Sequence, residues 1–241
     1  MSKWLALMVL LCSSPVYAEE AVQRDLPLSY LEQTQPGSNN QPLVIFLHGH
    51  GGSENDLFGL RESLPARYTY LSVRAPMTLA DGVFQWFDKT NRTGEYDGNT
   101  AQVKNSERLI AEFVVAAIQK YRTSAKKVYL VGFSQGAMVS YYVALHHPQA
   151  IGGIAALSGT MLPSLRAEVE PGKPLGMPAT FIGHGTSDGT LPFALAIEAD
   201  RLLKGGSVTV QFHAYPGLGH SINEAEVADL KHWLEQMNRG A

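Results

Sequence analysis

Cysteine, charge and long apolar runs are all scarce in this 241-residue chain. Cys12 is the only cysteine, 17% of the residues are charged, and the net charge is −3 with no basic run. Nucleic-acid binding needs a positive face, so this composition argues against a nucleic-acid partner. No repeat, low-complexity tract or linker divides the chain. With 45% hydrophobic residues, the composition is typical of one globular domain with a substantial core.

The longest apolar run at the N-terminus has the layout of a targeting segment. Lys3 precedes nine apolar residues, Trp4–Cys12, and Pro15 follows them. Val16-Tyr17-Ala18 then offers small residues at the −3 and −1 positions of a cleavage site. The pattern predicts a secretory signal peptide of residues 1–18, and the run is too short to span a bilayer. The alternative is an amphipathic or buried first helix.

Removal of residues 1–18 would leave a single domain, residues 19–241, without cysteine. Such a protein can form no disulfide and has no thiol nucleophile. A domain of this size does not require a disulfide, so the prediction is compatible with a bacterial periplasm. We therefore expect a periplasmic or secreted protein with no stable membrane insertion once the signal is removed.

Alternating strand and helix patterns predict the fold class. Leu43–Leu47 is a continuous apolar run of strand length, typical of a parallel strand covered on both faces. Apolar residues between Leu109 and Tyr121 recur at helical spacing. We expect an α/β protein with a mostly parallel central sheet and helices on both faces. The expected strands are 26–31, 43–47, 68–73, 127–131, 152–157, 179–182 and 208–212, and the expected helices are 109–121, 137–147, one after Pro192 and a last one capped by Asn223.

A long polar loop is expected from Asp81 to Lys104, and it contains an aromatic group, Phe84–Asp88. Aromatic side chains in a long loop could line a substrate pocket. They could equally close the loop onto the core. Both interpretations are kept, because one does not exclude the other.

The stretch Gly132-Phe133-Ser134-Gln135-Gly136 joins a predicted strand to a predicted helix. In this setting the G-x-S-x-G pattern predicts a sharp turn that presents the hydroxyl of Ser134 at the helix N-terminus. The backbone N–H of Gln135 would then point to where an oxyanion forms, and the helix dipole favours negative charge there. The alternative is an ordinary turn bounded by glycines.

A second glycine-rich loop, His48–Gly52, follows the predicted strand 43–47. In serine hydrolases of this build, the loop at this position donates the second oxyanion N–H, which we assign to His50. Two histidines two residues apart could also suggest a metal site. No third ligand is evident, so we expect His48 to brace the loop, His50 to face solvent, and no metal to bind.

Three residues complete a catalytic hypothesis, since a serine hydroxyl needs a base and the base needs an orienting carboxylate. Ser134, Asp188 and His220 each follow a predicted strand end, where parallel sheets place functional residues. Their order along the chain is the order found in α/β-hydrolases. Their alternatives are an Asx turn for the aspartate and a loop position for the histidine. The competitors fit less well by position: His146 and His147 at the far end of the serine helix, His213 within a strand, His184 as a loop brace, Asp200 within a helix and Asp88 upstream of the serine.

Five stretches stand in a fixed order: Leu43–Gly49, Trp86-Phe87-Asp88, Gly132–Gly136, His184–Asp188 and Gly219-His220. Together they resemble the phospholipase/carboxylesterase family, which includes bacterial carboxylesterases and acyl-protein thioesterases. The resemblance runs from about Pro42 to the last helix. It implies a compact α/β-hydrolase fold without a large lid domain. It implies the Ser134, Asp188 and His220 triad, the oxyanion N–H groups of His50 and Gln135, and Trp86 near the acyl side of the pocket.

The sequence departs from the family pattern in three ways. His50 stands where many members have leucine, and Gly189–Pro192 replaces a Pro-Val-Val-Pro type of run. A signal peptide is also unusual for the thioesterases of the family, which act inside cells. Cytosolic lipidated proteins are therefore not the expected substrates.

The sequence thus predicts an exported serine carboxylesterase that hydrolyses small-molecule esters of short to medium acyl chains without a cofactor. One alternative is a deacylase of an envelope component, such as an acetylated glycan, a lysophospholipid or a thioester. Another is an inactive hydrolase-fold binding protein. The sequence leaves the acyl length open, and it leaves open whether the protein is a homodimer.

Overall fold

The structure is a computed structural model, and it is described here for residues 21–35, 37, 39–90, 96–170 and 172–240. The predicted signal peptide, residues 1–18, lies outside the described residues.

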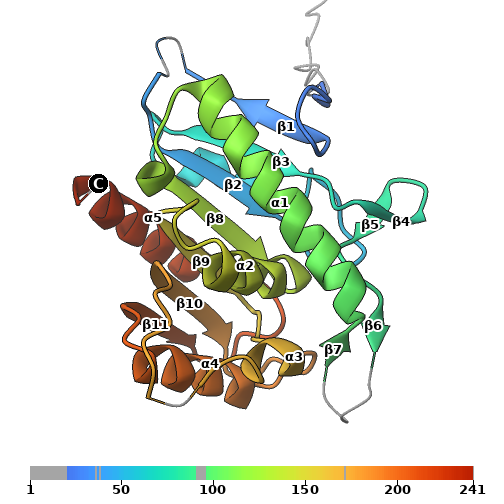
Figure 1. Ribbon diagram of the computed structural model, residues 1–241, viewed down its shortest axis with the longest axis vertical. Coiled ribbons are helices and arrows are strands. Elements are labelled where there is room, and N and C mark those ends of the chain that lie inside the picture. The colour runs from blue at the N-terminus through green and yellow to red at the C-terminus, as the bar shows by residue number, and fades with distance from the viewer. Residues whose placement is uncertain (1–20, 36, 38, 91–95, 171, 241) are drawn as a thin grey trace, which may run out of the picture.

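A seven-stranded sheet forms the centre of the molecule (Figure 1), in the order β1-β3-β2-β8-β9-β10-β11. Every neighbouring pair is parallel except β1 and β3, so the expected mostly parallel sheet is confirmed. The carboxyl ends of the parallel strands therefore meet at one edge. The strands are β1 (Tyr30–Gln33), β2 (Leu43–Leu47), β3 (Thr69–Val73), β8 (Val128–Phe133), β9 (Gly153–Leu157), β10 (Ala179–Gly185) and β11 (Val210–Tyr215).

Helices cover both faces of this sheet, as expected, and they divide the core in two. Buried residues of α1, α2, α3 and α4 pack on one face, and those of α5 and the 3₁₀ helix η1 pack on the other. The helices are α1 (Thr100–Tyr121), α2 (Gln135–His146), α3 (Pro163–Arg166), α4 (Phe193–Gly205) and α5 (Glu224–Arg239), with the 3₁₀ helices η1 (Phe58–Ser63) and η2 (Ala125–Lys127).

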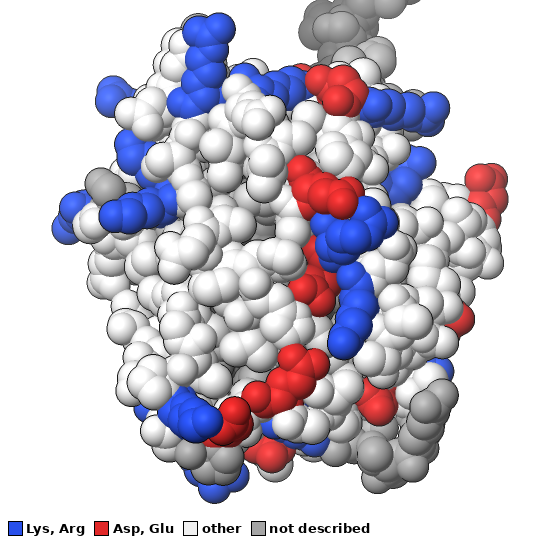
Figure 2. Space-filling model, viewed as in Figure 1, with Lys and Arg blue, Asp and Glu red and all other residues white. Residues whose placement is uncertain are grey.

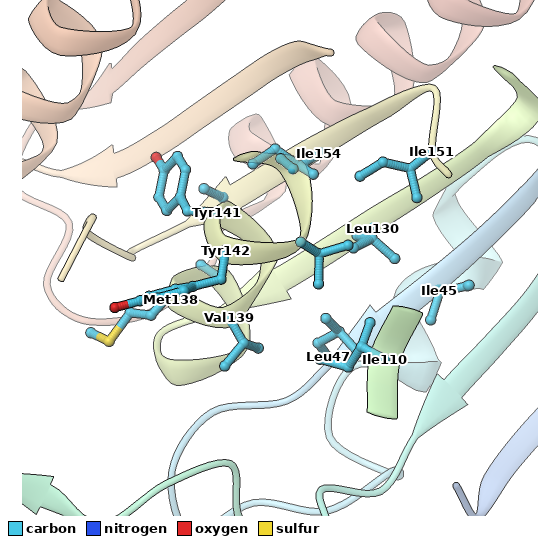
Figure 3. Close-up of a cluster of buried hydrophobic side chains, with 14 of the residues drawn as sticks. Ile45, Leu47, Ile110, Leu130, Met138, Val139, Tyr141, Tyr142, Ile151 and Ile154 are labelled. Atoms are coloured by element: carbon cyan, nitrogen blue, oxygen red, sulfur yellow. The ribbon is translucent and has the colours of Figure 1, made fainter. Parts of the chain in front are cut away.

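Strand β2 shows how the sequence makes these two layers. All five of its side chains are buried, and successive ones point to opposite faces. Ile45 and Leu47 therefore join the layer that contains α2, together with Leu130 and Met138 (Figure 3). Val44 and Phe46 join the layer below α5. This double burial explains why the strand is apolar at every position.

The region from Asp81 to Lys104 is more ordered than the sequence predicts. Two small antiparallel hairpins lie in and just before it, and α1 begins at Thr100 instead of after Lys104. The side chain of Asn99 caps this helix by accepting hydrogen bonds from the N–H groups of Ala101 and Gln102. The expectation of a loop up to residue 104 is therefore wrong. The hairpins are β4 (Met77–Ala80) with β5 (Val83–Gln85), and β6 (Lys89–Thr90) with β7 (Asp97–Gly98).

On the face shown in Figure 2, acidic and basic side chains alternate right of the centre and near the bottom, and separate basic side chains lie along the upper-left rim. One such pair on α1 is Arg108 and Glu112, whose charged groups lie 2.7 Å apart. Of the helices that the structure describes, none has both the length and the apolar character to cross a membrane.

Glu226 on α5 is a buried carboxyl group with a consequence for stability. It is 0% exposed, and neither of its oxygens has a hydrogen-bond partner among the described residues. One oxygen lies so close to Gly183 of β10 that a Cβ there would come within 2.2 Å of it. Burial, with a smaller contribution from the charge of Asp229, raises the pKa of Glu226 to about 8. The folded protein therefore favours the neutral acid.

Glu226→Gln is expected to flatten the dependence of stability on pH. Because the folded-state pKa lies above the unfolded value, the neutral acid stabilises the fold fully below about pH 4.5 and progressively less as the pH rises to about 8. At about 1.4 kcal/mol per pKa unit, wild type should lose roughly 4 kcal/mol of unfolding free energy between pH 5 and pH 9. Urea unfolding across this range measures the slope. The exposed Glu224→Gln variant is the control, and an unchanged slope in Glu226→Gln would contradict the assignment.

Candidate active site

Ser134 lies on a strained turn between β8 and α2. Its backbone angles φ and ψ are 53° and −116°, in a region that residues other than glycine rarely occupy. A Cβ on Gly136 would lie 1.9 Å from the carbonyl oxygen of Leu47, and one on Gly132 would lie 2.4 Å from the backbone of Gly136. Only glycine fits at these two positions. The predicted turn is therefore present, and it places the serine at the N-terminus of α2.

The structure brings together the three residues of the catalytic hypothesis. Nε2 of His220 lies 3.0 Å from Oγ of Ser134, and Nδ1 of His220 lies 2.7 Å from Oδ2 of Asp188. A carboxylate can only accept, so Nδ1–H donates to Asp188, and Nε2 is left to accept from the serine hydroxyl. This tautomer is the one that a general base needs.

Backbone groups hold the carboxylate of Asp188 in place. Its Oδ1 accepts the N–H groups of Thr190 and Leu191, each at 2.8 Å. Burial alone would raise the pKa of Asp188, but the hydrogen bonds from Leu191, His220 and Thr190 outweigh it and hold the pKa below its ordinary value. Asp188 is therefore ionised at neutral pH and can stabilise a protonated His220.

His184 braces this loop, as the sequence predicts. Its Nε2–H donates to the carbonyl oxygen of Leu191 at 2.9 Å and lies 3.3 Å from Oδ2 of Asp188. Burial lowers the pKa of His184, so the ring is neutral. This hydrogen bond joins His184, which precedes the turn carrying Asp188, to Leu191, which follows it.

The two residues predicted to donate oxyanion N–H groups flank the serine. Gln135 is the first residue of α2, and His50 follows Gly49, where a Cβ would lie 3.3 Å from Cβ of Ser134. Neither N–H group has a hydrogen-bond partner among the described residues. Both donors therefore remain available for an oxygen bound beside Ser134, and their role in catalysis stays a prediction.

His48 and His50 differ as expected. His48 is fully buried, its Nε2 accepts the N–H of Ala75 at 3.1 Å, and burial lowers its pKa. His50 is exposed. Within the described part of the chain, no group of three His, Cys, Asp or Glu side chains could hold a metal ion.

The aromatic group closes its loop onto the core. Trp86 is 0% exposed, and its Nε1–H donates to the carbonyl oxygen of His48 at 2.8 Å. Phe87 is equally buried. Trp86 thus holds the His48–Gly52 loop through this hydrogen bond. Its predicted place near the acyl side of a substrate pocket stays a prediction.

The competing histidines lie in other parts of the fold. His146 is bound between Glu107 and Glu168, at 2.9 and 2.7 Å. His147 is 3.1 Å from the same Glu107. His213 of β11 pairs with Asp229. Among the described residues, none of these side chains contacts Ser134, whereas His220 does.

The side chain of Gln135 has contacts that the sequence pattern does not predict. The G-x-S-x-G pattern assigns a function only to the backbone of this residue, whereas its buried amide makes three hydrogen bonds, to Trp86, Phe87 and Tyr96. A polar residue at the start of a helix that is otherwise mostly apolar was the available signal.

Comparisons with known proteins agree with this geometry. A family model described as Phospholipase/Carboxylesterase matches residues 29–238. A probable carboxylesterase SOBER1-like protein from Arabidopsis thaliana is 33% identical over 208 residues, covering 80% of this chain and 78% of the relative. Acyl-protein thioesterase 1 from Candida albicans is 28% identical over 221 residues, covering 83% of this chain and 94% of the relative.

A solved structure supports the fold independently. The Bacillus cereus carboxylesterase superposes with a TM-score of 0.72 at 24% identity, covering 87% of this chain and 94% of the other. The chain thus belongs to the phospholipase/carboxylesterase family of α/β-hydrolases, which are serine hydrolases that act on ester bonds.

Proposed function

We propose that this protein is an exported serine carboxylesterase that works through an acyl-enzyme intermediate. The observation that carries the proposal is the continuous hydrogen-bonded series from Ser134 through His220 to Asp188. Family membership supplies the reaction class, hydrolysis of ester bonds. Export rests on the sequence pattern of residues 1–18, which lie outside the described residues.

In the first half of the reaction, Oγ of Ser134 attacks the ester carbonyl carbon while Nε2 of His220 takes the hydroxyl proton. The N–H groups of His50 and Gln135 donate to the oxyanion, and Asp188 stabilises the protonated imidazole. The C–O bond to the alcohol then breaks, and His220 gives its proton to the leaving oxygen. An acyl ester on Ser134 remains.

Water completes the cycle. His220 takes a proton from the water as its oxygen attacks the acyl carbon, and the same N–H groups hold the second oxyanion. Collapse releases the carboxylic acid and returns the proton to Oγ of Ser134. Every group in this cycle comes from the protein or the substrate, so the proposed reaction has no place for a cofactor.

Substrate choice is the finer part of the proposal. We propose small esters of short to medium acyl chains. Deacylation of an envelope component is the second candidate, favoured by the predicted signal peptide. Acetylated glycans, lysophospholipids and thioesters all contain an acyl carbonyl group that Oγ of Ser134 would attack.

Hydrolysis of p-nitrophenyl esters from acetate to octanoate should be measurable, with a maximum that reports the size of the acyl pocket. A fluorophosphonate probe should label the protein on the peptide that contains Ser134. The full chain is expressed in a Gram-negative bacterium and purified from the periplasmic fraction, where its mass should correspond to cleavage after Ala18. No turnover on any ester and no label would contradict the enzymatic proposal. An uncleaved protein confined to the cytoplasm would contradict export alone.

A further inference from the structure

Gln135 uses its side chain as well as its backbone at the turn. The residue is 0% exposed, and its amide oxygen accepts the backbone N–H of Trp86 at 3.1 Å. Its Nε2 donates to the carbonyl oxygen of Phe87 at 2.9 Å and to the hydroxyl of Tyr96 at 3.1 Å. Both amide hydrogens are therefore used, and one residue joins the start of α2 to the segment that follows β5.

The same segment is fastened to the loop that carries the other proposed oxyanion donor. Trp86 donates its ring N–H to His48, and Phe84 exchanges backbone hydrogen bonds at 2.9 Å with Gly51 and Gly52. His50 lies between these attachment points. Residues 84–87 thus connect the Gln135 side chain on one side to the His48–Gly52 loop on the other.

The opposite side of this connection is closed by backbone packing. Gly136 leaves no space between α2 and the carbonyl oxygen of Leu47, where β2 runs into the His48–Gly52 loop. The start of α2 and the loop are therefore held together directly through Gly136 and indirectly through the Gln135 amide. The two N–H groups that would bind an oxyanion sit inside this closed arrangement.

We propose that the side chain of Gln135 is a positioning residue, which sets the separation of the His50 and Gln135 N–H groups by holding residues 84–87. This inference rests on the proposed function. An oxyanion forms only on the way to the tetrahedral intermediate, so a change in donor separation acts on the transition state more than on the bound ester. The rate constant kcat should therefore change while KM does not.

Gln135→Met is the first test, because methionine has a similar length and forms no comparable hydrogen bonds. Removing a whole oxyanion donor costs about 10²- to 10³-fold in kcat, so displacing one should lower kcat by about 10- to 100-fold. With p-nitrophenyl butyrate, KM should stay within about threefold of wild type. An aryl trifluoromethyl ketone, which forms an oxyanion on the serine, should bind weaker by a factor close to the kcat loss.

Gln102→Met is the matched control. Gln102 is another glutamine that bonds the same loop, through the backbone N–H and the carboxylate of Asp88. Within the described part of the chain, its side chain makes no hydrogen bond to the serine turn. Its loss should change kcat by less than about threefold. Equal kcat losses in the two variants would overturn the proposal, as would a Gln135→Met enzyme with wild-type kcat or with its defect in KM.

Gln135→Glu is a second variant that tests the same proposal if the methionine variant folds poorly. An ionised carboxylate would face the carbonyl oxygen of Phe87 without a hydrogen to donate, whereas the neutral acid can donate one. Burial raises the pKa of the new carboxyl group, so the neutral acid becomes more populated as the pH falls. The ratio of variant to wild-type kcat should therefore rise by about tenfold from pH 9 to pH 6, the size of one regained charge-free hydrogen bond. A ratio that does not change with pH would overturn the proposal.

These measurements distinguish failure of the proposed function from failure of the positioning role. A wild-type protein that hydrolyses no ester would contradict the proposed function. An active wild type whose Gln135 variants stay within about threefold of it in kcat contradicts only the positioning role.

Discussion

Ser134→Ala is expected to lower kcat for p-nitrophenyl esters by about 10⁵- to 10⁶-fold, and His220→Ala by a similar factor. The reason is that neither residue works without the other. Nε2 of His220 lies 3.0 Å from the serine oxygen, so this histidine is placed to take the serine proton, and a serine without it lacks its base. The double variant should therefore be no slower than the worse single variant, because residues that act as a unit are not additive.

Initial rates with the acetate and butyrate esters measure this prediction, and fluorophosphonate labelling confirms whether the nucleophile survives. His232→Ala provides the control, since His232 is exposed on α5 and lies outside the site. The thermal midpoint should remain near wild type in every variant. If the two single losses multiplied in the double variant, serine and histidine would not be acting as a pair.

Gly136→Ala is expected to destabilise the protein by on the order of 4–5 kcal/mol, or to prevent folding. In an open helix the same change would help, because alanine is favoured over glycine by about 1 kcal/mol. Here the new Cβ would lie 1.9 Å from the carbonyl oxygen of Leu47 and 2.7 Å from that of His48. These are backbone atoms of β2 and the following loop, so α2 itself would have to move away from the sheet.

Thermal unfolding is the measurement, and a loss of this size lowers Tm by about 10–20 °C in a domain of this length. Gly205→Ala is the matched control. Gly205 is also a helix residue, at the end of α4, and a Cβ there meets nothing within 4 Å. That variant should be as stable as wild type or slightly more stable. Similar Tm values for the two alanine variants would contradict the packing argument.

The buried parallel strands can be predicted because burial on both faces makes the residue at each position apolar. Leu43–Leu47 is apolar throughout and occupies β2 without a shift in its ends. The apolar spacing predicts this helix only from Leu109 onward, although α1 begins at Thr100. Its first turns are polar and partly exposed, so the apolar spacing that identifies a helix is missing there. The Asn99 cap was the remaining signal.

The candidate site was predictable to the extent that it is local. Ser134 is marked by glycines that the turn requires, and Asp188 and His220 by their place after strands. The contact of Gln135 with Trp86 joins residues 49 positions apart. Such contacts depend on how a loop folds back over the sheet. The hairpins β4–β5 and β6–β7, which carry this loop, consist of short and partly polar strands. Such strands are too short to show the alternation of apolar and polar residues that predicts a strand.

The backbone of Ser134 has a consequence for how this chain can change over generations. A residue held at positive φ is less stable there than glycine would be, by roughly 1 kcal/mol. Mutation to glycine at this site would thus give a more stable protein that has no nucleophile. A lineage with no need for the reaction would drift in that direction. In the proposed reaction, the hydroxyl of Ser134 is therefore kept at a cost in stability of this order.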